Sequence, residues 1–253
     1  MPRQDTVLLT RSPSQNQLLI RALAAIPDLD LQAVERPLLE FSDIPTTADM
    51  RQRVLSLDTY DHIIFVSQNA VTYGVDVLDV YWPQWPMALR WYGVGATTAT
   101  LLKEAGIECQ MPDDYSSEGL LALADLQVLA GRRVLIVRGQ QGGREYLREI
   151  LVQRGAEVDY LPVYSRRGCT YSQGFRGTLA PGKLLAGVVY SGESLRCLVN
   201  LMDWPAHDLR LIVPSTRLQK LAMQLGFDKV SVCTPVDIAV AAEIEQIWRA
   251  GSS

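Results

Sequence analysis

Small hydroxyl-bearing and glycine residues recur directly after the apolar runs that are typical of strands. They stand at Thr10–Ser12, Ser67–Asn69, Gly95–Thr97, Gly139–Gly143, Ser191–Ser194 and Pro214–Thr216. In an open parallel sheet, ligands bind beyond the carboxyl ends of the strands, where helix starts present free amide groups. Such loops suit carboxylates or phosphates, with Arg11, Arg138 or Arg144 close by in the sequence. The chemistry they predict is the binding of an anionic small molecule.

A simpler interpretation applies to each of these loops taken alone. Serine and threonine at a helix start commonly do no more than cap the helix. For any single loop, capping is the better explanation. Six such loops at the same edge of two sheets make ligand binding an equally good one, so both interpretations stay open at this point.

Strong catalytic groups are scarce. The chain has no Gly-x-x-x-x-Gly-Lys-Ser/Thr phosphate loop, and Gly139–Gly143 lacks the spacing of a dinucleotide fingerprint. The only histidines, His62 and His207, precede or lie outside the loops, so neither a metal centre nor a Ser-His-Asp triad can be assembled. A general base could come from one of three aspartates, although such loop carboxylates are usually solvated: Asp61, Asp113 and Asp114. We expect no metal and no cofactor, and catalysis that depends on shaping a reactive substrate.

Composition narrows the class of protein. The chain has 253 residues, 48% of them hydrophobic, which is enough for one large core or two smaller ones. A net charge of −4 argues against general nucleic-acid affinity but allows a locally positive cleft. The four cysteines are scattered singly, as expected of reduced packing residues. With no transmembrane segment or signal-peptide core, we expect a cytoplasmic monomer that acts on a small molecule and binds neither nucleic acid nor membrane.

The order of elements is that of an α/β protein. Short β-branched runs alternate with segments of helical period, which predicts parallel sheets covered by helices on both faces. Gly106, Gly155 and Gly226 stand where helices should stop. The ten expected strands lie near 7–10, 31–37, 61–66, 90–94, 108–111, 133–137, 157–163, 187–190, 210–213 and 229–232.

The sequence also repeats itself. Residues 65–70 and 92–98 return in altered form as 189–194 and 211–216, and residues 7–11 resemble 134–138. Thr97 and Thr216 lie 119 positions apart, and Gly106 and Gly226 lie 120 apart. Two related half-molecules are therefore expected, and two such halves leave a cleft between them.

Two divisions of the chain give five strands to each half. One is a linear split near residue 115; the other joins 1–38 to 167–253 and inserts 39–166. The longest interruptions between strands fall at matching places of the repeat, 42–60 and 165–186, and the segments that enter them could pair as a two-stranded linker. We therefore favour the insertion. The fold class we expect is two similar flavodoxin-like α/β domains with parallel five-stranded sheets, joined by a two-stranded linker.

The repeats, the strand that ends in Pro162-Val163-Tyr164, the element at 94–99 and its counterpart at 214–216 together resemble the uroporphyrinogen-III synthase family. The resemblance covers nearly the whole chain. It implies a hydro-lyase of tetrapyrrole and heme biosynthesis that closes the linear hydroxymethylbilane into uroporphyrinogen III, with loss of water and inversion of the last ring. It implies no metal and no organic cofactor. The substrate of that family carries eight carboxylates and its own leaving hydroxyl, which matches amide-rich loops and the lack of a nucleophile.

The resemblance also implies site residues. The family places a tyrosine at the end of the linker strand, so Tyr164 is expected to assist departure of the hydroxyl, unless it only packs. The family positions expected to bind substrate carboxylates are Ser67, Thr97, Arg144, Ser191, Ser215 and Thr216, and the loops add Arg11, Arg138 and Gly139. One departure is Pro214-Ser215, where the first half has Gly95-Ala96, because a proline removes one amide donor.

Two other functions stay open. A non-catalytic two-lobed binding or regulatory protein for an anionic metabolite would need no catalytic group. A flavodoxin-like electron carrier is less favoured, because no loop matches a flavin-phosphate site.

Overall fold

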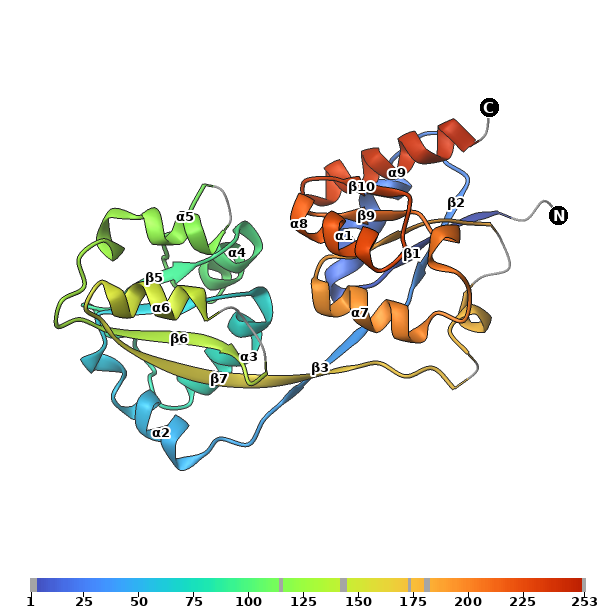
Figure 1. The fold of residues 1–253 in the computed structure, drawn as a ribbon. Helices are drawn as coiled ribbons and strands as arrows, with labels where there is room; N and C mark the ends of the chain where they lie inside the picture. Colours follow the sequence, from blue (N-terminus) through green and yellow to red (C-terminus); the bar gives the residue numbers. More distant parts are fainter. Residues whose placement is uncertain (1–3, 114–115, 142–144, 173, 180–182, 252–253) are drawn as a thin grey trace. The chain divides into compact units, whose positions relative to one another are not determined.

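A computed structural model describes residues 4–113, 116–141, 145–172, 174–179 and 183–251. The chain divides into two compact units, called here unit 1 (residues 1–40 and 167–253) and unit 2 (residues 41–166). Both are drawn in Figure 1. Among the described residues, no helix is both long enough and apolar enough to cross a membrane.

Unit 1 has a five-stranded sheet with the order β10-β9-β8-β1-β2. Every neighbouring pair is parallel. The strands are β1 (Asp5–Leu9), β2 (Leu31–Glu35), β8 (Leu184–Val188), β9 (Leu211–Val213) and β10 (Val230–Val232). Numbered within the unit, the order is 2-1-3-4-5, which is the flavodoxin-like arrangement.

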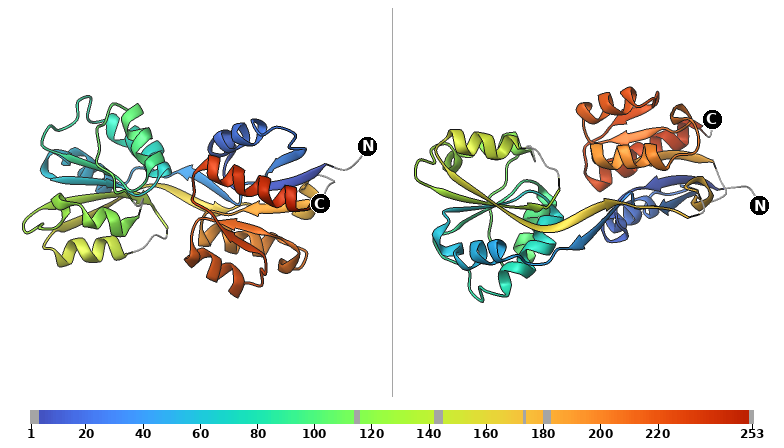
Figure 2. Two further views of the ribbon diagram at one scale, coloured as in Figure 1. Left: turned by 90° about the horizontal axis from the view of Figure 1, so that it is seen from above. Right: turned by 60° about the horizontal axis from the view of Figure 1, so that its bottom comes forward.

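Helices cover both faces of this sheet. One face packs against α1 (Pro13–Ala24) and α9 (Asp237–Gly251), through buried residues such as Leu19 and Ile244. The other packs against α7 (Gly192–Leu201) and α8 (Thr216–Gln224). Figures 1 and 2 show α1 and the orange α7 on opposite sides of the sheet. Two short 3₁₀ turns, Arg176–Thr178 and Ala206–Asp208, lie in the connections.

Unit 2 has a sheet with the order β3-β7-β6-β4-β5. Its strands are β3 (Leu39–Asp43), β4 (His62–Phe65), β5 (Arg90–Gly93), β6 (Arg133–Gly139) and β7 (Glu157–Gly168). The strands β7-β6-β4-β5 repeat positions 2-1-3-4 of unit 1, but in unit 2 the strands at positions 3 and 4 precede those at positions 1 and 2 along the chain. These four strands are therefore circularly permuted relative to unit 1, whereas β3 lies beyond β7, at the edge where the sheet of unit 1 ends with β2.

The helices of unit 2 also form two layers. The cluster that contains Phe65 and Val137 packs against α2 (Ala48–Leu55), α3 (Gln68–Asp79) and α4 (Ala96–Glu104). The cluster on the other face packs against α5 (Ser117–Ala122) and α6 (Tyr146–Gln153). Short 3₁₀ turns at Leu57–Thr59 and Ala124–Leu126 lead into β4 and toward β6.

The chain passes between the units within β3 and β7, which are neighbours in the sheet. The Cys169 amide donates to the Leu38 carbonyl, Arg167 pairs with Glu40, and Ser165 bonds Ser42. From one contact to the next, the residue number rises by two in β3 and falls by two in β7, so the two strands are antiparallel.

The expected fold class is confirmed, since the chain forms two mainly parallel five-stranded sheets with helices on both faces. In unit 2 the edge strand β3 departs from this pattern, because it runs antiparallel to β7. The strand expected at 108–111 is wrong. Only an isolated bridge between Tyr92 and Gln110 forms there, and the fifth strand of unit 2 is β3. Pro112 follows almost at once and has no amide to continue the ladder.

The glycine stops are confirmed. Gly106, Gly155 and Gly226 end their helices with φ of 75°, 92° and 92°, a left-handed conformation that other residues rarely adopt. The helix α1 begins at Pro13. Ser12 is the capping residue, and Pro13 occupies the first helical position, where its fixed φ suits the helix.

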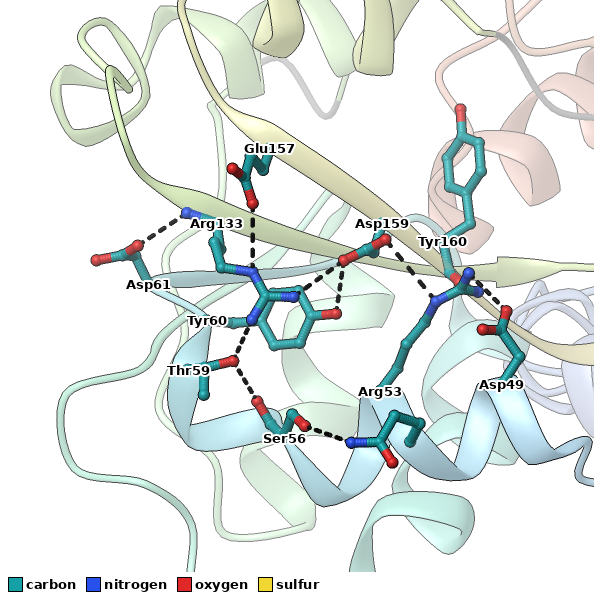
Figure 3. Close-up of polar contacts among 11 residues, drawn as sticks. Asp49, Arg53, Ser56, Thr59, Tyr60, Asp61, Arg133, Glu157, Asp159 and Tyr160 are labelled. Atoms are coloured by element: carbon teal, nitrogen blue, oxygen red, sulfur yellow. Dashed lines mark hydrogen bonds and ion pairs between the residues drawn. The ribbon is translucent and has the colours of Figure 1, made fainter.

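A polar network ties α2 to the sheet of unit 2. Asp159 accepts a hydrogen bond from the Tyr60 hydroxyl (2.7 Å) and lies 3.3 Å from Arg133 Nη2 and 3.8 Å from Arg53 Nε. Figure 3 shows Asp159 between the two guanidinium groups. Arg133 also stacks over the Tyr60 ring at 4.4 Å. Burial and this hydrogen bond raise the pKa of Tyr60, so its hydroxyl stays protonated.

Asp61 joins three strand starts. Its carboxylate accepts from the Arg133 amide (2.8 Å) and from Arg132 (2.6 Å), and its carbonyl accepts from the Arg90 amide (3.0 Å). Partial burial on its own would raise the pKa of Asp61, but the two hydrogen bonds to the carboxylate outweigh it and lower the pKa.

We expect Asp61→Asn to lower the free energy of unfolding at pH 7 by about 1 kcal/mol, because the neutral amide accepts these bonds more weakly. A lowered folded-state pKa stabilises fully above the unfolded value of about 3.9 and is lost as pH falls through the folded value. The difference from the unchanged protein, measured by urea denaturation, should therefore shrink below about pH 4. The exposed Glu104→Gln serves as control, and a pH-independent difference would contradict this role of Asp61.

Candidate functional site

The carboxyl ends of β4 and β6 are neighbours in unit 2, and the helices that follow them, α3 and α6, cover opposite faces of the sheet. Such a switch point is where open α/β sheets bind ligands. Ser67 lies here as the cap of α3, and its Oγ accepts from the Ala70 amide at 3.1 Å. Gly139 lies here as the last residue of β6.

Tyr164 reaches the same switch point from β7. Its ring packs between Phe41 (5.7 Å between centroids) and Tyr73 (5.5 Å), and its side chain is only 4% exposed. The hydroxyl lies 3.4 Å from Ser67 Oγ. Tyr164 is thus both a core residue and a phenol at the carboxyl edge of the sheet.

Gly139 makes room for this tyrosine. A β-carbon at position 139 would lie 2.8 Å from Tyr164 Cε2 and 2.9 Å from Tyr164 Cζ, closer than real contacts allow. The Gln140 amide donates to the Tyr164 carbonyl at 2.7 Å, after a register shift between Arg138 and Gly139. The structure therefore explains why residue 139 is a glycine: a larger residue would collide with the Tyr164 ring.

Arg138 is held within unit 2. Its Nη1 lies 3.1 Å from Glu145, and its guanidinium stacks over the Tyr160 ring at 4.4 Å. The Tyr160 hydroxyl donates to Glu145 at 2.6 Å, and hydrogen bonds from Tyr160 and Arg138 lower the pKa of Glu145. Burial, with Glu145 next in effect, raises the pKa of Tyr160 to about 12. Arg144 lies outside the described residues.

Thr97 is an exposed residue in the first turn of α4, which Gly95 caps without a side chain. The Ala96 and Thr97 amides form no hydrogen bond with any described residue. This helix start follows β5, beside β4, and therefore lies at the same edge as Ser67.

Three serines or threonines of unit 1 occupy equivalent helix starts. Ser191 caps α7, and its Oγ accepts from the Ser194 amide at 3.0 Å. Ser215 caps α8, and its Oγ accepts from the Leu218 amide at 3.3 Å. The capping interpretation thus holds for these serines and for Ser67. Thr216 is the first residue of α8 and is exposed.

The expectation that Pro214 removes an amide donor from a helix start is wrong. Counted from the helix starts, Ser215 matches Gly95, so Pro214 matches Val94 and precedes the cap. The Thr216 and Arg217 amides of α8 remain, and neither bonds a described residue. The spacing of the repeat here is 120, and Thr216 corresponds to Ala96 rather than to Thr97.

Arg11 follows β1 at the switch point of unit 1. Its Nη2 lies 2.8 Å from Asp237, the first residue of α9, and its guanidinium stacks over Tyr190 at 4.0 Å. Asn16 is fully buried, and its Nδ2 donates to the Arg11 carbonyl at 2.9 Å. The partners of the two arginines, Asp237, Tyr190, Glu145 and Tyr160, were not predicted, because their proximity depends on strand order rather than sequence spacing.

The alternative catalytic groups lie elsewhere. His62 begins β4, at the opposite edge from Ser67, and burial chiefly lowers its pKa. His207 lies in the 3₁₀ turn before β9, also at an amino edge. The Asp61 carboxylate accepts hydrogen bonds at the amino edge of the sheet, Asp113 is exposed, and Asp114 lies outside the described residues. No group of three potential metal ligands occurs in the described part of the chain.

Comparison with known proteins supplies the family. The family model described as "Uroporphyrinogen-III synthase HemD" matches residues 21–239. Uroporphyrinogen-III synthase of Salmonella typhimurium strain LT2 is 36% identical over 245 residues, which cover 92% of this chain and 96% of the relative. The protein of that name from Escherichia coli K12 is 34% identical, with the same coverage of both chains.

Solved structures agree on the fold. A mutant uroporphyrinogen III synthase from the extremely thermophilic bacterium Thermus thermophilus superposes with a TM-score of 0.62 at 16% identity, covering 97% of this chain and 99% of that one. A uroporphyrinogen-III synthetase from Helicobacter pylori 26695 gives 0.60 at 13% identity, covering 96% and 99%. The sequence matches decide the classification: this chain belongs to the uroporphyrinogen-III synthase family.

Proposed function

We propose that this protein closes hydroxymethylbilane into uroporphyrinogen III, losing water and inverting the last pyrrole ring. The observation that carries the proposal is membership of the family over nearly the whole chain. It favours a hydro-lyase over a non-catalytic binding protein, because the named relatives are synthases. A cytoplasmic location and a monomeric state remain predictions from the sequence.

We propose that the carboxyl edges of both sheets bind the substrate's carboxylates. Uncommitted amides at two helix starts support this: Ala96 and Thr97 in α4, Thr216 and Arg217 in α8. Helix N-termini favour anions through these amides and the helix dipole. The capping hydroxyls of Ser67, Ser191 and Ser215 fix the same edges. An octacarboxylate would share its binding among many weak contacts, so no single serine or threonine should dominate affinity.

We propose that Tyr164 assists departure of the substrate hydroxyl. Its phenol can donate a hydrogen bond, while Ser67 Oγ lies 3.4 Å away to orient it. The hydroxyl would leave with a proton as water, giving an azafulvene that the substituted carbon of the last ring attacks to form a spiro intermediate. Fragmentation and reclosure then invert that ring. The protein's part is to hold the flexible chain so that closure without inversion is slower.

The reaction is tested by feeding freshly generated hydroxymethylbilane to the purified protein, oxidising the products and separating the uroporphyrin isomers. We expect the type III isomer to dominate, because the protein must favour attack at the substituted carbon. Heat-denatured protein is the control. Type I alone, formed at the spontaneous rate, would contradict the proposed activity and favour the binding protein.

Tyr164→Phe should lower kcat about tenfold, since a hydrogen bond made in the transition state is worth about 1.4 kcal/mol. Stability should change by less than about 1 kcal/mol, because the ring keeps its packing. The matched control is Tyr73→Phe, whose ring packs against Tyr164 but whose hydroxyl has no hydrogen-bond partner among the described residues. Steady-state kinetics and urea denaturation measure both effects. Unchanged kcat in the Tyr164 variant would leave Tyr164 as a packing residue.

A further inference from the structure

Each unit holds one arginine in the same chemical setting at its switch point. Arg11 stacks over Tyr190 and pairs with Asp237; Arg138 stacks over Tyr160 and pairs with Glu145. The arginines are matching positions of the internal repeat, 7–11 against 134–138.

Their partners are not matching positions. Tyr190 follows β8 and Asp237 opens α9, whereas Tyr160 lies on β7 and Glu145 caps α6. Duplication of one ancestral contact would reproduce the same elements in both units. Two different sets of elements have instead arrived at one arrangement, which points to a common requirement at both edges.

In unit 2 the arrangement keeps the arginine fixed and leaves the carboxylate open to replacement, because the Arg138 side chain is 12% exposed and that of Glu145 is 54% exposed. In unit 1 the Arg11 and Asp237 side chains are about equally buried, at 19% and 23% exposed. Stacking on a tyrosine orients the guanidinium plane, so its edge presents N–H groups to any carboxylate that lies in that plane. Figure 3 shows the Tyr160 side chain pointing away from the Asp159 network, so the ring is available to stack on Arg138.

The unit 1 cluster is also incomplete. Three of its side-chain atoms, Arg11 Nε, Tyr190 Oη and Asn16 Oδ1, are buried without a hydrogen-bond partner among the described residues. Buried polar atoms are normally paired, so a cluster of unpaired ones indicates a place that rearranges around, or is completed by, another polar group.

We infer that Asp237 and Glu145 are internal stand-ins for substrate carboxylates, which displace them from Arg11 and Arg138 when the substrate binds. This rests on the proposed function, because the displacing group is a carboxylate of the tetrapyrrole. The internal acids keep the arginines in place in the empty protein and compete with the substrate. Glu145 and Asp237 are thus affinity-setting residues, and neither takes part in bond making.

The test uses Glu145→Gln, which removes the charge while its amide oxygen still accepts from Tyr160. A partly exposed ion pair is worth about 0.5–1 kcal/mol, so KM for hydroxymethylbilane should fall about two- to fivefold with kcat unchanged. The dissociation constant of the stable octacarboxylate uroporphyrin III, followed by its fluorescence, should fall by the same factor. Asp237→Asn should act in the same direction.

Two controls separate displacement from a general change of charge. Glu149→Gln alters the same helix by the same charge one turn later, at an exposed position, and should leave both constants unchanged. In an Arg138→Gln background, which itself raises KM, Glu145→Gln should have no further effect, because nothing remains to be released.

An unchanged or raised KM in folded Glu145→Gln, equal effects of Glu145→Gln and Glu149→Gln, or additivity in the double variant would each overturn the inference. The unchanged protein's yield of type III isomer is measured in the same assay. Its absence would mark failure of the proposed function, separately from failure of the displacement of Glu145.

Discussion

Unpaired backbone amides at helix starts are the constraint on which this structure depends. In a parallel sheet every strand delivers its following helix start to the same edge, and the first amides of each helix have no partner within it. This chain applies the rule in two units. Serine side chains cap three of the starts, while the first amides of α4 and α8 stay uncommitted among the described residues. An edge of this kind binds anions through its backbone and needs no strong acid, base or metal.

Side-chain chemistry is then limited to a few groups that the fold holds firmly. Tyr164 is fixed by Phe41 and Tyr73 over the space that Gly139 leaves open, so a residue at the carboxyl edge is also part of the hydrophobic core. The two arginines are fixed by tyrosine rings and by carboxylates of their own units. Each group is positioned by packing before any substrate arrives, which is the economical way to orient a flexible ligand.

Much of the fold could be predicted from the sequence, because strand-helix alternation, terminal glycines and the internal repeat are local signals. The pairing of the two linker segments was also expected, but not that it would make β3 the fifth strand of the unit 2 sheet. The segment 108–111, expected in that place, forms only one bridge before Pro112. In the site, the serines and threonines were predictable as helix starts. The pairing of Arg138 with Glu145 and Tyr160 was not, because stacking across neighbouring strands leaves no trace in sequence spacing.

The most direct test of the account is whether the backbone of both units binds the ligand. Two-dimensional ¹⁵N NMR of the full chain, with and without uroporphyrin III, reports each amide separately. Binding through helix starts predicts shifted resonances and slowed solvent exchange at Ala96 and Thr97 in unit 2 and at Thr216 and Arg217 in unit 1, with helix interiors unchanged. Saturable binding that leaves the amides of both helix starts unaltered would contradict it.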